Sequence, residues 1–264
     1  MPSVISKAPP LAVGLALVLA PSAQAQDLPI EGMWNYRVSE WTDGASVPQP
    51  ELTQEAKDLL ARKKAAERSG YTRSVASMIC LPIGFPGVMF FRTPIQILAG
   101  AGRVAITAES AIEPRTVYLD IPHPDVLDPS WYGNSVGHWE SGDLIVDTVG
   151  LNGRGKHHGI WQVGRDLPGT SDQAHIVERF HVEPDGQVLT MTMTVEDPVY
   201  YAKPYSVTVH YDRMPNDSPR YEAVCEVDFD ALAKVDLEAI KDIDVEAERM
   251  LDPNIQYNPI DSSK

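Results

Sequence analysis

The stretch that most constrains the fold runs from Ser135 to Gly150, SVGHWESGDLIVDTVG. Two runs with strand composition flank a Ser-Gly-Asp turn signal at 141–143, so the stretch predicts a β-hairpin. With Glu140 and Asp143 on either side of the turn, alternate side chains point to opposite faces of the hairpin. The mostly apolar face is predicted to hold Ser135, Gly137, Trp139, Leu144, Val146 and Thr148, and the mostly acidic face His138, Glu140, Asp143, Ile145 and Asp147.

Alternating apolar and polar residues recur on both sides of this hairpin. Further strands are predicted at 31–41, 88–91, 94–99, 103–109, 115–120, 174–182, 188–196, 205–211 and 221–227. Each apolar row needs a buried face, and a long antiparallel meander tends to close on itself because unpaired strand edges promote aggregation. The sequence therefore predicts a mainly β fold, either a single antiparallel up-and-down barrel or a strongly bent sheet. A sandwich of two sheets is the alternative.

Two helices are predicted outside the strands. Thr53 is a suitable N-cap for a helix over 54–68, whose few apolar residues form a narrow stripe, as expected of a helix on the surface of a barrel. From Asp228 the composition shifts to Ala, Leu, Asp, Glu and Lys, which predicts a C-terminal helix near 229–251 followed by a tail. The predicted domains are a β-barrel over 26–228 and a C-terminal helix and tail over 229–264.

The first 25 residues have the layout of a secretory signal peptide. Lys7 is followed by an apolar run from Leu11 to Ala20 and an A-x-A cleavage site at Ala23-Gln24-Ala25. The apolar run is too short for a transmembrane helix. We therefore expect cleavage near Ala25 and a mature protein that is periplasmic or secreted from a bacterium. An uncleaved anchor is the alternative.

The net charge limits which binding partners are expected, and the cysteine content indicates the cellular compartment. The chain has 37 acidic against 22 basic residues and a formal net charge of −15. This balance opposes binding to nucleic acid and to anionic membrane surfaces, and favours neutral, cationic or metal-ion partners. The only cysteines, Cys80 and Cys225, predict a disulfide in an oxidising compartment, with two buried thiols as the alternative.

Several motifs of the chain occur together. The central one reads Ser-x-Gly-x-Trp-Glu at 135–140, followed by Asp-Leu-Ile-Val-Asp-Thr-x-Gly at 143–150. The shorter ones are Cys80-Leu-Pro, Arg115-x-x-Tyr-Leu-Asp, His123-Pro, Trp131, Val177-Glu-Arg-Phe, Asp197-Pro and Cys225-Glu. Over most of residues 27–228 this pattern resembles a large family of secreted bacterial proteins whose general activity is not established.

Two details refine the resemblance. Members of that family often carry His-Ser where this chain has Thr170-Ser171, so the role of that histidine is either lost or taken by another residue such as His175. Gly32-x-Trp34 is similar to the opening strand of lipocalins, in which a tryptophan closes one end of the barrel. This second resemblance implies a lipocalin-like barrel.

Three residues are candidate acid–base catalysts. His123 lies between Pro122 and Pro124 and precedes Asp128, and a histidine near carboxylates can transfer protons close to neutral pH. The alternative is a loop histidine bonded to a backbone carbonyl. His138 would form a proton-transfer pair with Asp147 if its hairpin face looked into a cavity. The outward orientation is favoured, because the opposite hairpin face makes the better core.

Glu178 shares a strand face with apolar neighbours. Burial would raise the pKa of this carboxyl group and make it a candidate acid. Because buried charges are normally paired, an ion pair with Arg92 or Arg115 is the favoured alternative.

Polar and aromatic residues near the strand ends are candidate substrate-binding groups. They include two residues of a long polar, glycine-rich loop over 151–172, and loops of this length are usually functional or disordered. The predicted substrate-binding residues are Arg115, Tyr118, Trp131, Tyr132, Asn152, Trp161 and His175. Such a set could line a pocket for an apolar or aromatic small molecule.

No motif in the chain specifies a metal or a cofactor. The donors available for a metal ion are His123, Asp125, Asp128, His157, His158 and His175, but no metal-binding spacing is present. Nucleophile-elbow, phosphate-loop and dinucleotide patterns are also missing from the sequence. We therefore predict neither a metal nor a cofactor.

These observations support three functional hypotheses. The first is a cofactor-free extracytoplasmic enzyme of lyase, isomerase or hydratase type, in which His123, Asp128 and His138 move protons on a mostly apolar or aromatic small molecule. The second is a lipocalin-like binding protein without catalysis. A third is a structural envelope protein with a filled barrel.

Overall fold

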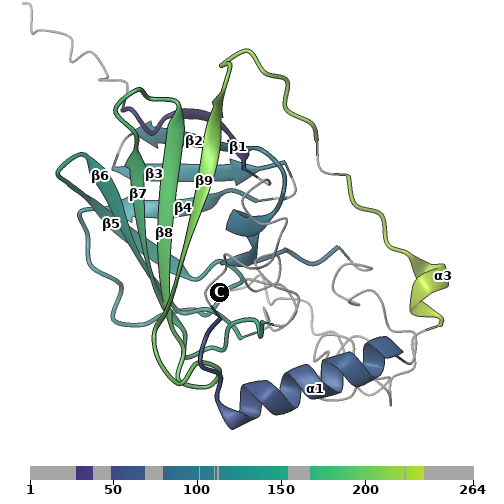
Figure 1. Ribbon diagram of the computed structural model, residues 1–264. Helices are drawn as coiled ribbons and strands as arrows, with labels where there is room; N and C mark the ends of the chain where they lie inside the picture. Colours follow the sequence, from purple (N-terminus) through teal and green to yellow (C-terminus); the bar gives the residue numbers. More distant parts are fainter. Residues whose placement is uncertain are drawn as a thin grey trace, which may run out of the picture.

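A computed structural model describes residues 28–37, 49–68, 80–100, 102–109, 111, 113–153, 167–222 and 224–234 (Figure 1). The predicted signal peptide over 1–25 and the candidates His157, His158 and Trp161 lie outside these residues. The strands are β1 (Gly32–Tyr36), β2 (Ile95–Gly100), β3 (Arg103–Ala108), β4 (Arg115–Leu119), β5 (Asn134–Glu140), β6 (Asp143–Val149), β7 (His175–Val182), β8 (Val188–Glu196) and β9 (Tyr205–Met214). The helices are α1 (Gln54–Arg68), the 3-10 helix η2 (Gly87–Phe90) and α3 (Phe229–Leu232).

Within the described residues the nine strands form one closed barrel in sequence order. β1 closes it by pairing antiparallel with both β2 and β9, so every strand has two neighbours. The predicted mainly β, lipocalin-like barrel is confirmed. No helix in the described ranges is long and apolar enough to cross a membrane.

One strand pair differs from the predicted antiparallel order. β4 and β5 are parallel, with Val117 opposite Ser135 and Leu119 opposite Gly137. Parallel neighbours need a connection that returns to the starting end of the sheet. Residues 120–133, here called the crossover segment, make that return.

The 135–150 hairpin has the predicted register. Glu140 lies opposite Asp143, and Ser135 lies opposite Thr148. Both Ser141 and Gly142 have positive φ, as a two-residue turn of the favoured hairpin type requires. The predicted apolar face points into the barrel and is buried except at the partly buried Trp139.

The helix predicted at 54–68 is α1. Its first turn is capped as predicted, since the Ala56 amide donates to Thr53 Oγ1 at 3.2 Å. The Thr53 hydroxyl also donates to the carbonyl of Val199 at 2.6 Å. Figure 1 shows α1 lying below the barrel, and Ala56 and Leu59 are the buried residues of its narrow stripe.

The strand predicted at 88–91 is wrong, because residues 88–90 belong to the buried 3-10 helix η2 at one end of the barrel. No edge of the closed barrel is left for another strand to pair with. The helix is held in place from inside the barrel, because Tyr211 Oη donates to the Met89 carbonyl. Its own side chains Val88, Met89 and Phe90 are buried in the core together with Phe85, which precedes the helix.

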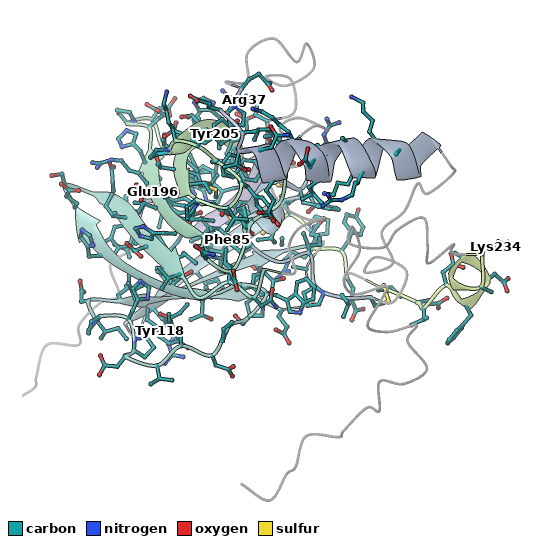
Figure 2. The ribbon with its side chains drawn as sticks, turned by 90° about the horizontal axis from the view of Figure 1, so that it is seen from below. Arg37, Phe85, Tyr118, Glu196, Tyr205 and Lys234 are labelled. Atoms are coloured by element: carbon teal, nitrogen blue, oxygen red, sulfur yellow. A yellow bond between two sulfur atoms is a disulfide. The ribbon has the colours of Figure 1, made fainter. Side chains whose placement is uncertain are left out.

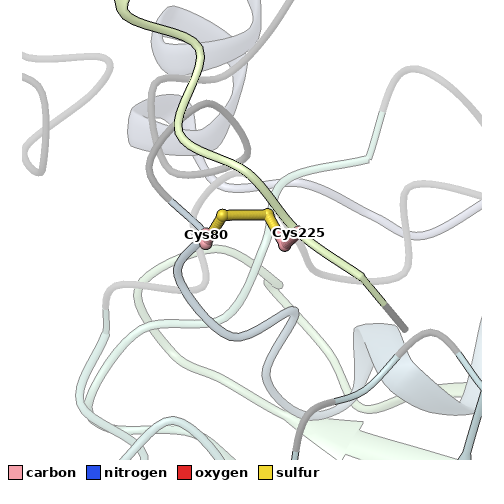
Figure 3. Close-up of a disulfide and its surroundings, with 2 residues drawn as sticks. All are labelled: Cys80 and Cys225. Atoms are coloured by element: carbon pink, nitrogen blue, oxygen red, sulfur yellow. A yellow bond between two sulfur atoms is a disulfide. The ribbon is translucent and has the colours of Figure 1, made fainter. Parts of the chain in front are cut away.

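The prediction of a last strand over 221–227 is also wrong. Tyr221 and Val224 are exposed, and Figure 1 shows the chain beyond β9 running beside the barrel to α3. Cys225 in this segment forms the predicted disulfide with Cys80 (Figure 3). The helix predicted near 229–251 starts as expected, and within the described residues α3 covers Phe229–Leu232. Residues 235–264 lie outside the described residues.

The opposite end of the barrel is closed around Trp34. This side chain is fully buried, and its indole N–H donates to the carbonyl of Ile30 at 2.8 Å. The Arg213 guanidinium stacks 4.1 Å from the indole ring and donates to the carbonyl of Glu31 at 2.9 Å. The tryptophan predicted to close one end therefore does so together with an arginine from the last strand.

Candidate functional site

Five polar side chains meet on the outer wall of the barrel around Asp147. One carboxylate oxygen of Asp147 is 2.9 Å from Nε2 of His123, and the other is 2.9 Å from Nε2 of His175. The second ring nitrogen of His123 is 2.7 Å from Oδ1 of Asn134, and that of His175 is 3.8 Å from Glu196. These five residues are called the Asp147 cluster.

The barrel topology brings these residues together from five segments. Asp147 points outward because its neighbours Val146 and Thr148 point into the core. β7 lies beside β6 and presents His175, whose partner on β8 is Glu196. The crossover segment carries His123 back over the outer wall, which follows directly from the parallel pairing of β4 and β5.

The hydrogen bonds keep Asp147 ionised. Partial burial raises the pKa of this carboxyl group, but hydrogen bonds from His175 and His123 outweigh the burial and leave the pKa below its ordinary value. An ionised carboxylate can only accept hydrogen bonds, so each imidazole must donate an N–H to Asp147.

The cluster is open to solvent on one side. The side chains are 24% exposed at His123 and 40% exposed at both Asp147 and His175. Val136 and Val177 lie directly opposite Asp147 on the neighbouring strands and form an apolar border. Histidine and carboxylate in hydrogen-bond contact, reachable from solvent, can transfer protons. Among the described residues no group of three or more His, Cys, Asp or Glu side chains is arranged to hold a metal ion.

The other two predicted catalysts lie apart from this cluster. His138 is exposed on the outer wall opposite Ile145, in the outward orientation favoured from the sequence. Asp128 is exposed in the crossover segment. Within the described part of the chain no hydrogen bond or ion pair joins either residue to His123. Their catalytic roles stay predictions.

Arg115 lies inside the barrel and not at its surface. It is 1% exposed and pairs with the fully buried Glu178, to which its Nη1 donates at 3.0 Å. The Arg115 guanidinium also donates hydrogen bonds to the hydroxyls of Ser135 and Thr148. The ring of Phe85, labelled in Figure 2, lies with its centroid 3.8 Å from the guanidinium carbon. The favoured ion pair of Glu178 with Arg115 is confirmed. Burial raises the pKa of Glu178, and Arg115 opposes the rise.

The remaining predicted binding residues are dispersed. Tyr118 is exposed on the outer wall beside Arg103. Trp131 lies at the end closed by η2, where its carbonyl accepts from the Phe85 amide at 2.9 Å. Next to it, burial raises the pKa of Tyr132 to about 12, and the hydroxyl has no hydrogen-bond partner in the described structure. Asn152 is half-buried.

The Thr170-Ser171 pair is buried and belongs to a hydrogen-bond network with Asp197. The Ser171 amide donates to the buried Asp197 at 2.7 Å, and the Ser171 hydroxyl donates to it at 2.8 Å. Thr170 is 1% exposed. His175, four residues after Ser171, is the histidine that reaches the Asp147 cluster.

A second carboxylate on β6 offers a comparison. Asp143 accepts from His181 Nδ1 and Arg179 Nε, each at 2.6 Å, and Arg179 also reaches Glu140 at 3.4 Å. Burial raises the pKa of Asp143, but the hydrogen bonds from His181 and Arg179 leave it below its ordinary value. This Asp143 cluster is a salt-bridge network beside the hairpin turn, and no residue of the crossover segment reaches it through an ion pair or hydrogen bond within the described ranges.

Sequence reasoning missed two members of the Asp147 cluster. Asn134 and Glu196 carry no motif of their own, and only strand register brings them near His123 and His175. Asp147 could be found from the sequence, because the hairpin alternation places it on the polar face. No family model matches this chain. No curated protein matches it either. The family resemblance therefore stays a prediction.

Proposed function

We propose that the protein is a cofactor-free enzyme that transfers protons on a small molecule, in a reaction of lyase, isomerase or hydratase type. The Asp147 cluster is its site. The observation that carries the proposal is the sharing of one ionised carboxylate by two imidazoles that are both reachable from solvent. A carboxylate that fixes an imidazole in one orientation is a recurrent element of acid–base catalysis.

The surroundings of the cluster favour a neutral or cationic substrate with an apolar part. Asp147 and Glu196 both bring negative charge to His175, which opposes an anion. Val136 and Val177 offer apolar contact on either side of Asp147. A neutral or cationic partner is also what the net charge of the chain favours, and a mostly apolar or aromatic substrate is what the aromatic residues near the strand ends predict.

We place the mature enzyme outside the cytoplasm of a bacterium. The signal-peptide layout ending at Ala25 supports this location, as does the Cys80–Cys225 disulfide. The mass of the protein recovered from a periplasmic extract should correspond to a chain that starts at Gln26. Recovery of the full-length chain in the cytoplasmic fraction would contradict the location.

Deuterium exchange tests for proton transfer whichever overall reaction the enzyme catalyses. The purified protein is incubated in D₂O with a panel of neutral and cationic small molecules that carry an acidic C–H, and mass spectrometry follows deuterium uptake. We expect uptake with wild type and with Asp143→Asn, and a loss of at least about tenfold with Asp147→Asn. Asp143→Asn is the matched control, because it removes a histidine-bonded carboxylate from the same strand. Equal exchange by both variants, or none across the panel, would contradict the proposal.

The closed barrel with a tryptophan at one end favours a second candidate, a lipocalin-like binding protein. An apolar fluorescent probe would then bind with an affinity that Asp147→Asn does not change. The buried Arg115–Glu178 pair and Phe85 occupy part of the interior that such a ligand would need. For this reason we favour the acid–base enzyme.

A further inference from the structure

The two histidines of the Asp147 cluster differ in how many of their ring nitrogens have a hydrogen-bond partner. Both nitrogens of His123 have a partner, since Nδ1 is 2.7 Å from Asn134 and Nε2 is 2.9 Å from Asp147. Within the described residues His175 has one hydrogen-bonded ring nitrogen, Nε2, which lies 2.9 Å from Asp147. Its Nδ1 lies 3.8 Å from the Glu196 carboxylate, which is beyond hydrogen-bond distance.

Hydrogen-bond chemistry fixes where the ring protons are. A carboxylate only accepts, so Nε2 of each histidine must carry a hydrogen and donate it to Asp147. In the neutral form of His175 this leaves a lone pair on Nδ1. The Nδ1 of His123 faces the Asn134 amide, which can turn to offer either its oxygen or its nitrogen, so this atom is occupied in both orientations.

We propose that His175 is the catalytic residue of this site, acting through Nδ1, and that Asp147 and His123 are positioning residues. The inference rests on the proposed function and changes the role expected of His123 from its sequence. Asp147 fixes the His175 ring through Nε2, and His123 holds Asp147 from the other side. Glu196 stands next to the nitrogen that reacts.

The proton balance of the step is simple. Nδ1 of neutral His175 takes a proton from a C–H or O–H group of the substrate, and the electron pair of the broken bond stays on the substrate. The ring becomes an imidazolium, which the negative charges of Asp147 and Glu196 stabilise. Return of the same proton to another substrate atom completes an isomerisation and restores the neutral ring.

Chemical modification of the full chain tests the assignment directly. Diethyl pyrocarbonate acylates an imidazole nitrogen that has an accessible lone pair, and mass spectrometry locates the modified histidines. We expect His175 to react at a rate within a few-fold of the exposed His138, and His123 to react at least about tenfold more slowly, because both of its nitrogens are occupied.

The variant Asn134→Ala tests whether His123 reacts slowly because its Nδ1 is hydrogen-bonded or because its side chain is less exposed. The variant frees Nδ1 of His123 and should raise the modification rate of this residue at least about fivefold, while the rate at His175 stays unchanged. Wild-type rates that are equal at His123 and His175 would overturn the inference. So would a rate at His123 that does not respond to Asn134→Ala.

Deuterium exchange with His175→Gln and His123→Gln distinguishes this inference from the proposed function. We expect a loss of about 10²–10⁴-fold with His175→Gln and only a few-fold loss with His123→Gln, whose amide can still donate to Asp147. If His123→Gln abolishes exchange and His175→Gln does not, the assignment of roles is wrong but the acid–base function stands. If Asp147→Asn and His175→Gln both keep full exchange, the proposed function itself fails.

Discussion

Asp143 and Asp147 stand on the same strand and each accepts hydrogen bonds from a histidine of β7, yet their surroundings differ. Asp143 also accepts from Arg179, an always-charged donor, in a network beside the hairpin turn. Among the described residues Asp147 is bonded only to imidazoles, which can act both as proton donors and as proton acceptors. At the scale of single residues, this difference in donors separates a structural carboxylate from one suited to proton transfer.

The lowered pKa of Asp147 predicts a pH-dependent contribution to stability. A carboxyl group whose pKa is lower in the folded than in the unfolded chain stabilises the fold above its ordinary pKa of 3.8, and this stabilisation is lost as the pH falls through the folded value. We expect Asp147→Asn to reduce the free energy of unfolding by about 1 kcal/mol at neutral pH, a figure reduced for the exposure of the carboxylate. In urea titrations the difference should shrink as the pH falls below 3.8. A constant difference would contradict this account.

The Arg115–Glu178 pair predicts strong coupling in a double-mutant cycle. Either Arg115→Met or Glu178→Met leaves one buried charge without its partner, which costs about 3–5 kcal/mol. The double variant should lose much less than the sum of the two, because it leaves no unpaired charge. Urea unfolding measures all three, with the exposed Arg103→Met as the control. Additive losses would show that the pair is not coupled.

At the scale of elements, the crossover segment determines where the site can be. A wholly antiparallel barrel would join β4 to β5 by a short turn at one end. The parallel pairing instead sends residues 120–133 back over the outer wall, where His123 meets Asp147. The site therefore belongs to the outside of the barrel, and the buried Arg115–Glu178 pair belongs to its core.

The cap of α1 gives a test at the same scale. Thr53→Ala removes the hydroxyl that accepts from Ala56 and donates to Val199, so we expect a loss of about 1 kcal/mol in the free energy of unfolding and reduced helical signal in circular dichroism. Thr53→Ser keeps the hydroxyl and should lose only a few tenths of a kcal/mol. Equal losses in both variants would argue that the methyl group, and not the cap, is what matters.

The alternation and capping residues of the sequence were enough to predict the strands, hairpin and helix whose hydrogen bonds join residues close in sequence. The 188–196 strand and the helix at 54–68 have the predicted bounds, and the two strands of the 135–150 hairpin agree with the prediction to within one residue, because alternation and capping depend on neighbouring residues. The parallel β4–β5 pair could not be predicted in this way, since strand direction depends on the path of the crossover segment and not on alternation.

The errors at 88–91 and 221–227 have one common cause. Both stretches have strand composition, but a closed barrel has no free edge, so neither can find a partner. Alternation of apolar and polar residues indicates a preference for extended structure, but it does not indicate how many strands the barrel contains. For the site, the sequence predicted His123 as a candidate and Asp147 as part of a polar face. It could not predict that Asn134 and Glu196 join them.

At the scale of the molecule, the disulfide links two segments outside the barrel wall. Cys80 precedes the loop that carries η2, and Cys225 belongs to the exposed chain beyond β9. The bond spans 145 residues of sequence, so it restricts nearly the whole barrel in the unfolded chain. It should therefore act mainly on stability and leave the Asp147 cluster unchanged.

Removing the disulfide tests this expectation. The simple chain-entropy model predicts that the double variant Cys80→Ser/Cys225→Ser loses roughly 4–5 kcal/mol in the free energy of unfolding. Urea unfolding of wild type with and without reductant is the parallel measurement. The variant should keep the wild-type rate of diethyl pyrocarbonate modification at His175. A loss below about 1 kcal/mol would mean that the unfolded chain is hardly restricted by the bond.

The pairing of β1 with β9 has a consequence for chains that are cut short. Met33 of the first strand pairs with Met214 of the last, so nearly the entire barrel must be synthesised before the wall can close. A fragment ending before Tyr205 would leave both β1 and β8 with unpaired backbone amides and carbonyls. Truncated products should accordingly self-associate or be degraded instead of persisting as smaller folded proteins.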